Sequence, residues 1–166
     1  MQRRMKIDYS CPVLYRLYKP EDFVALYAIE QVCFHPPDRF SRGYMRRLVE
    51  QPNSATWIAE EDESMSGFAL VEWTREAELA AYIQTLEVVP ERRGKGVGGE
   101  LLRRLENSAS AAGAALIWLH VDAENAAAIC VYQARGYVRH GREEDYYGRN
   151  RAALIYAKPL GVEQAI

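Results

Sequence analysis

The chain has 166 residues, of which 49% are hydrophobic, and its formal net charge is −2 at pH 7. This length suits one domain with a substantial core, and the near-neutral charge argues against a nucleic-acid-binding surface. No apolar run approaches the ~20 residues of a membrane-spanning helix, so neither nucleic acid nor a membrane is an expected partner. Residues 1–10 are basic and polar without an apolar secretory core. We therefore expect a flexible tail over residues 1–10, one domain over residues 11–166 and a cytoplasmic location.

The first part of the chain predicts a strand and two helices. Residues 13–17 form the expected strand, and Pro20 with the acids after it starts a helix whose apolar stripe runs to Cys33. The segment 35–38 breaks this helix. Ser41 can cap a second helix, whose apolar residues share one face.

Three strands are expected next. They cover residues 56–60, 65–74 and 78–89, and a charged hairpin turn over residues 61–64 separates the first two. Together with the preceding elements they predict the order β-α-α-β-β-β, with the last three strands in an antiparallel meander.

A loop, a helix and a further strand follow. The helix is expected from Val97 because Val97, Leu101 and Leu105 recur at helical spacing. Residues 115–121 form a nearly all-apolar strand, as expected for a strand that is covered on both faces.

The chain then predicts a short helix and a final strand pair. The helix covers residues 126–135 and ends at Gly136 in the C′ position. Residues 137–142 and 152–158 are expected to pair antiparallel, with the polar loop 143–150 between them. The elements predict one α+β domain with a mixed, mostly antiparallel sheet of about seven strands and about four flanking helices.

The three cysteines, Cys11, Cys33 and Cys130, are odd in number and have no C-x-x-C spacing. This pattern argues against a disulfide framework and against a zinc site, so we expect buried thiols and no bound metal. A nucleophilic role for Cys130 would need a His or an acid to activate the thiol, and the spacing places none there.

A glycine-rich basic turn follows Pro90. Gly94, Gly96, Gly98 and Gly99 have no Cβ, so the backbone can turn tightly and bring its N–H groups up to a ligand. The unpaired N–H groups and the positive dipole end of the next helix favour an anion. A phosphate-bearing ligand is therefore the first hypothesis, and a solvated cluster of basic side chains is the alternative.

Two common phosphate-binding motifs fit this turn poorly. A P-loop needs Ser or Thr after its Gly-Lys pair, but Gly96 follows Lys95. A dinucleotide fingerprint matches at Gly94, Gly96 and Gly99, with Asp122 where a ribose-binding acid is expected. However, too few residues follow Asp122 for the remaining strands of a doubly wound domain.

Two stretches carry more specific motifs. The run Arg93-Gly94-Lys95-Gly96-Val97-Gly98 resembles the pyrophosphate-binding motif Arg/Gln-x-x-Gly-x-Gly/Ala of the GNAT acetyltransferase superfamily. One strand further on, the run Asn125-Ala-Ala-Ala128-Ile-Cys-Val-Tyr132-Gln-Ala-Arg-Gly136-Tyr137 is similar to its signature Asn-x-x-Ala-x-x-x-Tyr-x-x-x-Gly-Phe/Tyr. The two motifs have the order and separation of that superfamily.

The resemblance implies the GNAT fold, acetyl-CoA as co-substrate and transfer of its acetyl group to a primary amine. The connection from Phe34 to Ser41 looks most like the branch that acetylates protein N-termini, typified by the ribosomal-protein alanine N-acetyltransferase. A small-molecule amine as acceptor and a non-catalytic acyl-CoA-binding module are the alternatives. Oligomeric state and the use of a longer acyl group stay open.

The resemblance also implies roles for individual residues. Backbone N–H groups near Leu86 would hold the pantetheine and the thioester oxygen, Asn125 would fix the cofactor arm, and Tyr132 would protonate the departing thiolate. The acceptor would be lined by Phe34, Tyr146 and Tyr147, although the two tyrosines could instead simply pack on the domain. The residues expected to bind the cofactor are Leu86, Glu87, Val88, Arg93, Gly94, Lys95, Gly96, Val97, Gly98, Gly99, Asn125 and Tyr132.

The general base is where the chain departs from the pattern. N-terminal acetyltransferases place a Glu twelve residues before the catalytic tyrosine, and this chain has His120 there. Imidazole, with an ordinary pKa of about 6.5, is a competent base near neutral pH. Glu87, acting through a water molecule, is the competing candidate. Alternation puts its side chain opposite those of Leu86 and Val88, and which face meets the acceptor stays open.

Overall fold

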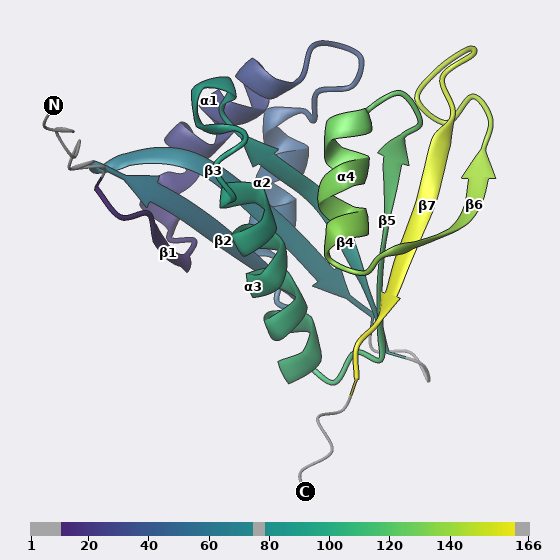
Figure 1. Ribbon diagram of the computed structural model, residues 1–166. Helices are drawn as coiled ribbons and strands as arrows, with labels where there is room; N and C mark the ends of the chain where they lie inside the picture. Colours follow the sequence, from purple (N-terminus) through teal and green to yellow (C-terminus); the bar gives the residue numbers. More distant parts are fainter. Residues whose placement is uncertain (1–10, 75–78, 162–166) are drawn as a thin grey trace, which may run out of the picture.

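The computed structural model describes residues 11–74 and 79–161 (Figure 1). The predicted tail and Glu78, where a strand was expected to begin, lie outside these ranges. Within them, seven strands form one sheet in the order β1-β2-β3-β4-β5-β7-β6. The strands are β1 (Leu14–Leu17), β2 (Ser54–Glu61), β3 (Ser64–Trp73), β4 (Ala80–Val88), β5 (Leu116–Asp122), β6 (Val138–Glu143) and β7 (Ala153–Pro159). The helices are α1 (Phe23–Cys33), α2 (Arg42–Glu50), α3 (Val97–Ala111) and α4 (Ala126–Ala134), with 3₁₀ turns η1 (Pro20–Asp22) and η2 (Pro90–Arg92).

The sheet is open at its centre. β4 and β5 run parallel and pair only over residues 80–82 and 116–118, whereas the other neighbouring strands are antiparallel. Beyond these residues β4 and β5 diverge, so the two halves of the sheet form a V (Figure 1). Each of the two strands therefore has an edge without a strand partner facing the opening.

A β-bulge in β4 decides which side chains face which way. Leu70 of β3 lies opposite Thr85, but Val71 lies opposite Ile83, so Gln84 is the extra residue. A bulge reverses the alternation of the bulged strand relative to its partner. As a result, Thr85 lies on the face of the sheet that carries Leu70, and Ile83 lies on the opposite face.

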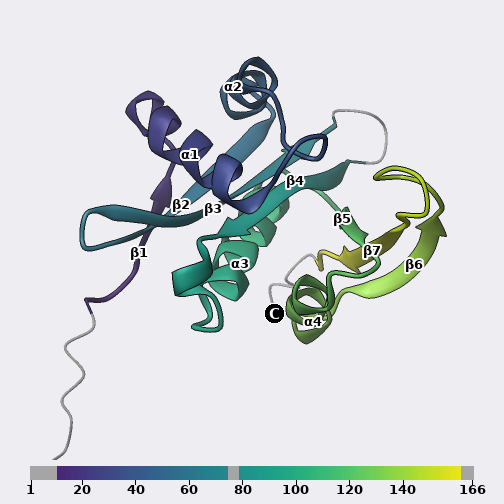
Figure 2. The same cartoon turned by 90° about the horizontal axis from the view of Figure 1, so that it is seen from above.

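Helices cover both faces of the sheet. Figure 2 shows α1 and α2 on one face and α3 and α4 on the other. The core on the α3 side includes Leu102 and Ile117, and the core on the α1–α2 side includes Leu26 and Phe68, all four of which are fully buried. The central strand β3 is therefore buried on both faces over residues 66–71, as its apolar sequence requires.

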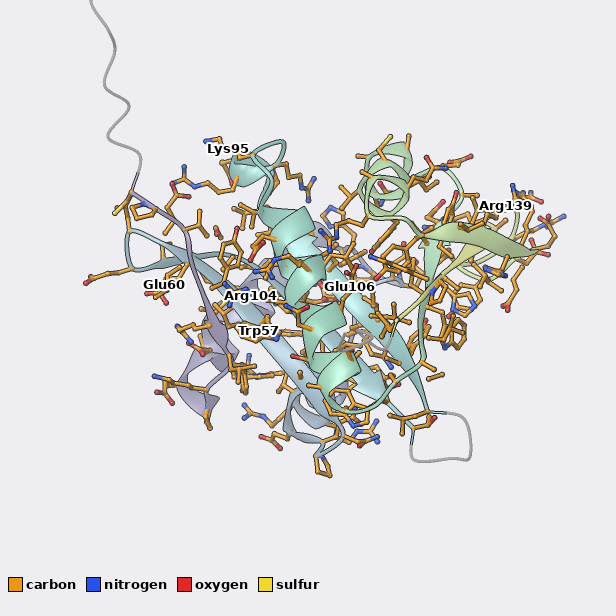
Figure 3. All side chains as sticks on the ribbon, turned by 60° about the horizontal axis from the view of Figure 1, so that its bottom comes forward. Trp57, Glu60, Lys95, Arg104, Glu106 and Arg139 are labelled. Atoms are coloured by element: carbon orange, nitrogen blue, oxygen red, sulfur yellow. The ribbon has the colours of Figure 1, made fainter. Side chains whose placement is uncertain are left out.

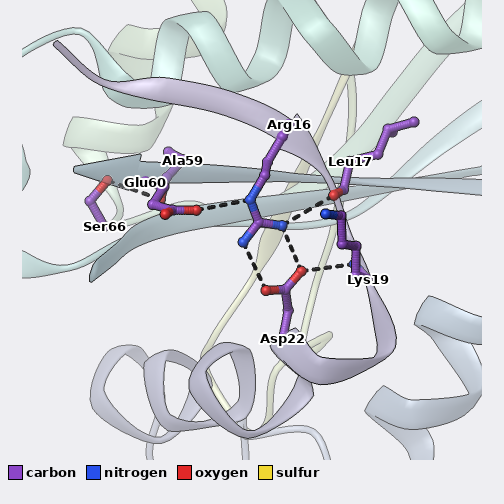
Figure 4. Close-up of polar contacts among 7 residues, drawn as sticks. All are labelled: Arg16, Leu17, Lys19, Asp22, Ala59, Glu60 and Ser66. Atoms are coloured by element: carbon purple, nitrogen blue, oxygen red, sulfur yellow. Dashed lines mark hydrogen bonds and ion pairs between the residues drawn. The ribbon is translucent and has the colours of Figure 1, made fainter. Parts of the chain in front are cut away.

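Ion pairs fix the start of α1 to the edge of the sheet. The Arg16 guanidinium on β1 pairs with Asp22 at 2.7 Å and with Glu60 on β2 at 2.8 Å (Figure 4). The Asp22 carboxylate also accepts the backbone N–H of Lys19 at 2.8 Å. Asp22 thus occupies the N-terminus of α1, where a carboxylate interacts favourably with the helix dipole.

Polar contacts join α3 to the C-terminal end of α4 and to the sheet. Glu106 on α3 is 6% exposed and pairs with Arg135 at 2.7 Å and with Lys158 on β7 at 3.1 Å. The Trp57 indole N–H donates to the Ser108 hydroxyl at 2.9 Å. Figure 3 places Glu106 midway along α3, well away from Lys95 at the loop end of the helix.

The predicted α+β fold, its element order and the mixed, mostly antiparallel sheet are confirmed. Two expectations were wrong. β5 is buried on one face only, because its other face lines a cavity rather than a second core layer. Cys11 and Cys130 are exposed and Cys33 is half-buried, so the thiols are not core residues. No helix within residues 11–74 and 79–161 has the length and apolar content for crossing a bilayer.

Candidate active site

A cavity of about 1470 Å³ occupies the opening between β4 and β5. It is lined by Asn125 and Tyr132 from α4 on one side, and by Tyr82 and Phe34 on the side of α1 and α2. The cavity therefore spans the sheet, with walls from both layers of helices. We call the part beside α4 the donor end. The part lined by Phe34, Glu72, Tyr82, His120, Tyr146 and Tyr147 is called the acceptor end.

The edge of β4 beyond Tyr82 is free to bind an extended ligand. Its neighbour β5 pairs with it only as far as Tyr82, so among the described residues no strand covers this edge over residues 83–88. Leu86 lines the cavity, and its strand leads to the glycine-rich turn. Unpaired backbone groups on such an edge can hydrogen-bond a ligand as a further strand would.

The glycine-rich turn has the conformation of an anion cradle. Gly94 and Gly96 have φ values of +75° and +85°, which L side chains rarely adopt, and Gly96 is the N-cap of α3. The first intrahelical donor is the N–H of Glu100, which bonds to the Gly96 carbonyl at 3.1 Å. The N–H groups of Val97, Gly98 and Gly99 precede it, at the positive end of the helix dipole.

Open space surrounds this cradle. A Cβ built on Gly94, Gly96 or Gly99 meets no heavy atom within 4 Å, and one on Gly98 meets only the Val88 side chain at 3.8 Å. The protein itself therefore does not need these glycines for packing. Their bare backbone fits the close approach of a phosphate group.

The basic side chains of the turn differ in orientation. Arg93 donates to the Val88 carbonyl at 2.9 Å and lies 3.6 Å from the Cys33 sulfur, so its guanidinium points back to β4 and α1. Lys95 is exposed at the tip of the turn. Both residues were predicted to bind the cofactor. Lys95 can move toward a bound anion, whereas the Arg93 side chain is held by its contacts with Val88 and Cys33.

Two residues of the second motif lie at the donor end. Asn125 is the N-cap of α4, where its side-chain oxygen accepts the Ala128 N–H at 3.1 Å, which leaves its amide N–H₂ as a donor. Tyr132 is 6% exposed and lines the cavity wall. Burial raises the pKa of Tyr132, so its hydroxyl keeps its proton at neutral pH.

His120 lies at the acceptor end between a tyrosine and a carboxylate. Its Nδ1 is 3.0 Å from the Tyr82 hydroxyl, and its Nε2 is 3.3 Å from Oε1 of Glu143. A carboxylate can only accept, so Nε2 carries a proton, and Nδ1 of the neutral ring then accepts the Tyr82 O–H. The Tyr146 ring stacks on the imidazole with centroids 4.3 Å apart, which fixes the ring plane.

Glu87 lies elsewhere. Its side chain is 2% exposed, accepts the Thr85 hydroxyl at 2.6 Å and is not part of the cavity wall. Glu30 on α1, 1% exposed, is its neighbour and accepts the Phe40 N–H at 2.8 Å. Burial, followed by the Glu30 carboxyl, raises the pKa of Glu87 well above its ordinary value. The structure therefore brings His120 into contact with Tyr82 in the cavity wall, whereas Glu87 lies behind that wall and contacts Thr85, which lines the cavity.

The acceptor end is bounded by two loops. Phe34 and Asp38 belong to the α1–α2 loop, and Tyr146 and Tyr147 belong to the β6–β7 loop. Arg151 joins the two loops, because its guanidinium lies 2.9 Å from a carboxylate oxygen of Asp38 and 2.9 Å from one of Asp122. The predicted substrate residues Phe34, Tyr146 and Tyr147 thus share one end of the cavity.

Tyr82 was missed by sequence reasoning. It lies in an apolar strand, and its relation to His120 depends on the parallel register of β4 and β5, in which Tyr82 lies opposite Trp118. A strand-helix-strand unit around the glycine turn predicts two parallel neighbours, so polar aromatic residues on both could have suggested the pairing. Their register was not available from the sequence.

Comparison with known proteins agrees with this geometry. Residues 21–137 match the model of the acetyltransferase (GNAT) family. Streptothricin acetyltransferase of Streptomyces lavendulae is 34% identical over 113 residues, which are 68% of this chain and 59% of that protein. The [ribosomal protein bS18]-alanine N-acetyltransferase of Salmonella typhimurium is 29% identical over 104 residues, 61% of this chain and 68% of that protein.

The fold itself is shared with solved structures. Arabidopsis thaliana NAA60 in complex with acetyl-CoA superimposes with a TM-score of 0.81 at 20% sequence identity, covering 90% of this chain and 99% of that chain. The family match spans more than two thirds of the chain and contains the glycine-rich turn, Asn125 and Tyr132. The chain belongs to the GNAT acetyltransferase family.

Proposed function

We propose that this chain acetylates the α-amine at a protein N-terminus, with acetyl-CoA as the acetyl donor. The family gives the reaction class, which is that of an acetyl-CoA-dependent N-acyltransferase. The observation that carries the proposal is the cavity through the sheet, which has Tyr132 at its donor end and the Tyr82–His120 contact at its acceptor end. A donor and an acceptor can therefore meet inside the sheet from opposite sides.

The donor end suits a pyrophosphate and an extended arm. The N–H groups of Val97, Gly98 and Gly99 would hold the phosphates, and the free edge of β4 would bind the pantetheine. This arrangement would deliver the thioester to the opening between the strands. Tyr132, protonated and in the cavity wall, is placed to give its proton to the departing thiolate.

The acceptor end suits proton removal from an ammonium group. The Tyr82 hydroxyl would take the amine's proton while its own proton moves to Nδ1 of His120. Glu143 would stabilise the resulting imidazolium from the Nε2 side. Burial and neighbouring Tyr146 raise the pKa of Tyr82, so its hydroxyl keeps its proton at neutral pH and does not act as a phenolate. Tyr82 would therefore pass a proton on, and His120 would be the final proton acceptor.

The surroundings of the acceptor end favour a peptide. This end lies between the α1–α2 loop and the β6–β7 loop, where an extended chain can lie. The relatives include enzymes named for a ribosomal-protein alanine and for protein N-alpha-acetylation. A small-molecule amine is the second candidate, because a relative is named for streptothricin. The cytoplasmic location stays a prediction.

One assay separates these possibilities. The protein is incubated with acetyl-CoA and a panel of peptides and small amines, thiol release is followed, and mass spectrometry locates the acetyl group. We expect kcat/KM for peptides to exceed that for small amines, with the label on the α-amine. Transfer to small amines alone would assign a small-molecule enzyme. Acetyl-CoA binding by calorimetry without thiol release for any acceptor would assign a binding module.

A further inference from the structure

The acceptor end contains a carboxylate, that of Glu72 on β3, that makes no ion pair with any residue in 11–74 or 79–161. Glu30 and Glu124 also line the cavity without an ion pair among the described residues, but Glu30 is 1% exposed and Glu124 lies beside Asn125 at the donor end. The other acids of this region have partners. Asp38 and Asp122 pair with Arg151, and Glu143 contacts His120. Arg39, a further cation in the cavity wall, donates to the backbone carbonyls of α1. Glu72 therefore leaves a negative charge in the cavity wall.

Neutral donors hold this carboxylate in one orientation. Its Oε1 accepts the Gln84 amide at 2.6 Å, and its Oε2 accepts the Gln51 amide at 2.5 Å. Gln84 is the bulge residue of β4, and Gln51 is the C-cap of α2. Amide donors orient a carboxylate without neutralising it, and each oxygen retains a lone pair for a further donor. The two amides therefore hold the Glu72 side chain in place in the cavity wall.

Aromatic rings lie beside it. Glu72 is the cross-strand partner of Tyr82, so their side chains are neighbours on one face of the sheet. The Tyr82 ring packs against Trp118 with centroids 4.7 Å apart. A carboxylate next to aromatic rings is an environment that recognises ammonium and guanidinium groups.

The position of Glu72 separates it from the reacting amine. Tyr82 on β4 lies between Glu72 on β3 and His120 on β5. Under the proposed function the amine gives its proton to Tyr82, the cross-strand neighbour of Glu72, and neighbouring strands are ~4.8 Å apart. An extended peptide covers roughly 3.3 Å per residue, so this spacing corresponds to one or two residues.

We propose that Glu72 binds a second cationic group of the acceptor, so that the enzyme prefers amines that carry another ammonium or guanidinium group one or two residue lengths away. This inference rests on the proposed function. In a peptide the second cation is the side chain of Lys or Arg at position two or three. In a small acceptor it is the other end of a diamine.

Matched acceptors test the inference. Peptides that differ only in Lys or norleucine at position two or three are compared, and 1,5-diaminopentane is compared with pentylamine. For the wild type we expect kcat/KM to favour the cationic member by about tenfold, as for one partly buried charge pair. In Glu72→Gln this ratio falls toward one, because only the cationic member loses a charge partner. If the peptide pair shows this preference, the second cation belongs to a peptide. If the pair of 1,5-diaminopentane and pentylamine shows it, the second cation belongs to a small molecule.

Controls keep the outcomes distinct. Glu124→Gln removes a carboxylate from the same cavity beside Asn125 and should leave the ratio unchanged. Added salt should lower the ratio in the wild type, a readout that needs no variant. A wild-type ratio near one, or an equal loss for both members in Glu72→Gln, would overturn the inference. Absence of transfer to every acceptor would instead overturn the proposed function.

Discussion

The Tyr82 hydroxyl lies 3.0 Å from Nδ1 of His120, where the two halves of the sheet separate. Glu143 on the other side of the imidazole fixes which nitrogen accepts. Three side chains from three strands thus form a path along which a proton can leave the acceptor amine. Of these three side chains, the sequence pointed to His120 as the base, with Glu87 as the competing candidate.

The Tyr82–His120 contact predicts that the two residues act as a unit. Tyr82→Phe keeps the ring and removes the hydroxyl, so turnover should fall by about 10²-fold with unchanged affinity for acetyl-CoA. The turnover of the double variant Tyr82→Phe/His120→Ala should be at most about threefold lower than that of either single variant. Steady-state kinetics with calorimetry test this. Fully multiplicative losses would show that the two residues act separately.

The choice of base predicts different pH profiles for two variants. The acidic limb of kcat/KM reports the base of the free enzyme, so it should move or vanish in His120→Ala and persist in Glu87→Gln. Glu87 is 2% exposed and lies outside the cavity wall, which is why its loss should spare the limb. His120→Glu restores the residue of the family pattern and should keep activity with a displaced limb. An inert Glu87→Gln beside a fully active His120→Ala would give the role to Glu87.

Tyr132 predicts a loss at the leaving-group step. Burial raises its pKa and keeps the proton that the thiolate needs, so Tyr132→Phe should bind acetyl-CoA normally and turn over about 10²-fold more slowly. Tyr137→Phe is the matched control, because the centroid of that ring lies 5.7 Å from that of Tyr132 and its buried hydroxyl has no hydrogen-bond partner within residues 11–74 and 79–161. The control should retain full turnover. Equal activity of both variants would refute the assignment.

The glycine cradle predicts a contrast between neighbouring positions. A Cβ at Gly98 makes only an ordinary van der Waals contact with the Val88 side chain at 3.8 Å, so Gly98→Val should keep its melting temperature but bind acetyl-CoA at least about tenfold more weakly. Gly96 has a φ of +85°, so Gly96→Val should also lose about 1–2 kcal/mol of stability. Calorimetry and thermal denaturation on both variants provide the check. Unchanged affinity in Gly98→Val would mean that the phosphates bind elsewhere.

The buried pair of Glu30 and Glu87 predicts a pH dependence of stability. Burial, followed by the Glu30 carboxyl, raises the pKa of Glu87 above its ordinary 4.5, so the folded state keeps a proton that the unfolded chain releases. The stability linked to this proton is complete below the unfolded-state pKa and is lost as pH rises through the folded-state pKa. The free energy of unfolding should therefore fall with rising pH more steeply in the wild type than in Glu87→Gln.

Urea denaturation between pH 5.5 and 9 measures this difference. Glu50→Gln is the control, because the Glu50 side chain is 60% exposed and should leave the slope unchanged. Identical slopes in the wild type and Glu87→Gln would mean that the buried pair retains no extra proton.

Local patterns in the sequence were sufficient for much of this molecule. Helical spacing in α3, the Ser41 cap of α2 and the left-handed Gly136 after α4 depend on neighbours along the chain, and all three were predicted. The glycine-rich turn and the Asn125–Tyr132 motif are equally local, so the family could be identified from the stretch between the end of β4 and the end of α4. In the structure the glycine-rich turn caps the start of α3, and Asn125 caps the start of α4.

Only the tertiary structure decided which groups meet in the cavity. The bulge at Gln84 and the short parallel pairing of β4 with β5 set the faces of Tyr82 and Glu87, and neither leaves a signal in the residue pattern. The contact between Arg151 and Asp38 joins residues 113 positions apart. Register and strand divergence result from packing two layers of helices on one sheet, so the partners of His120 follow from the whole fold and not from its own stretch of sequence.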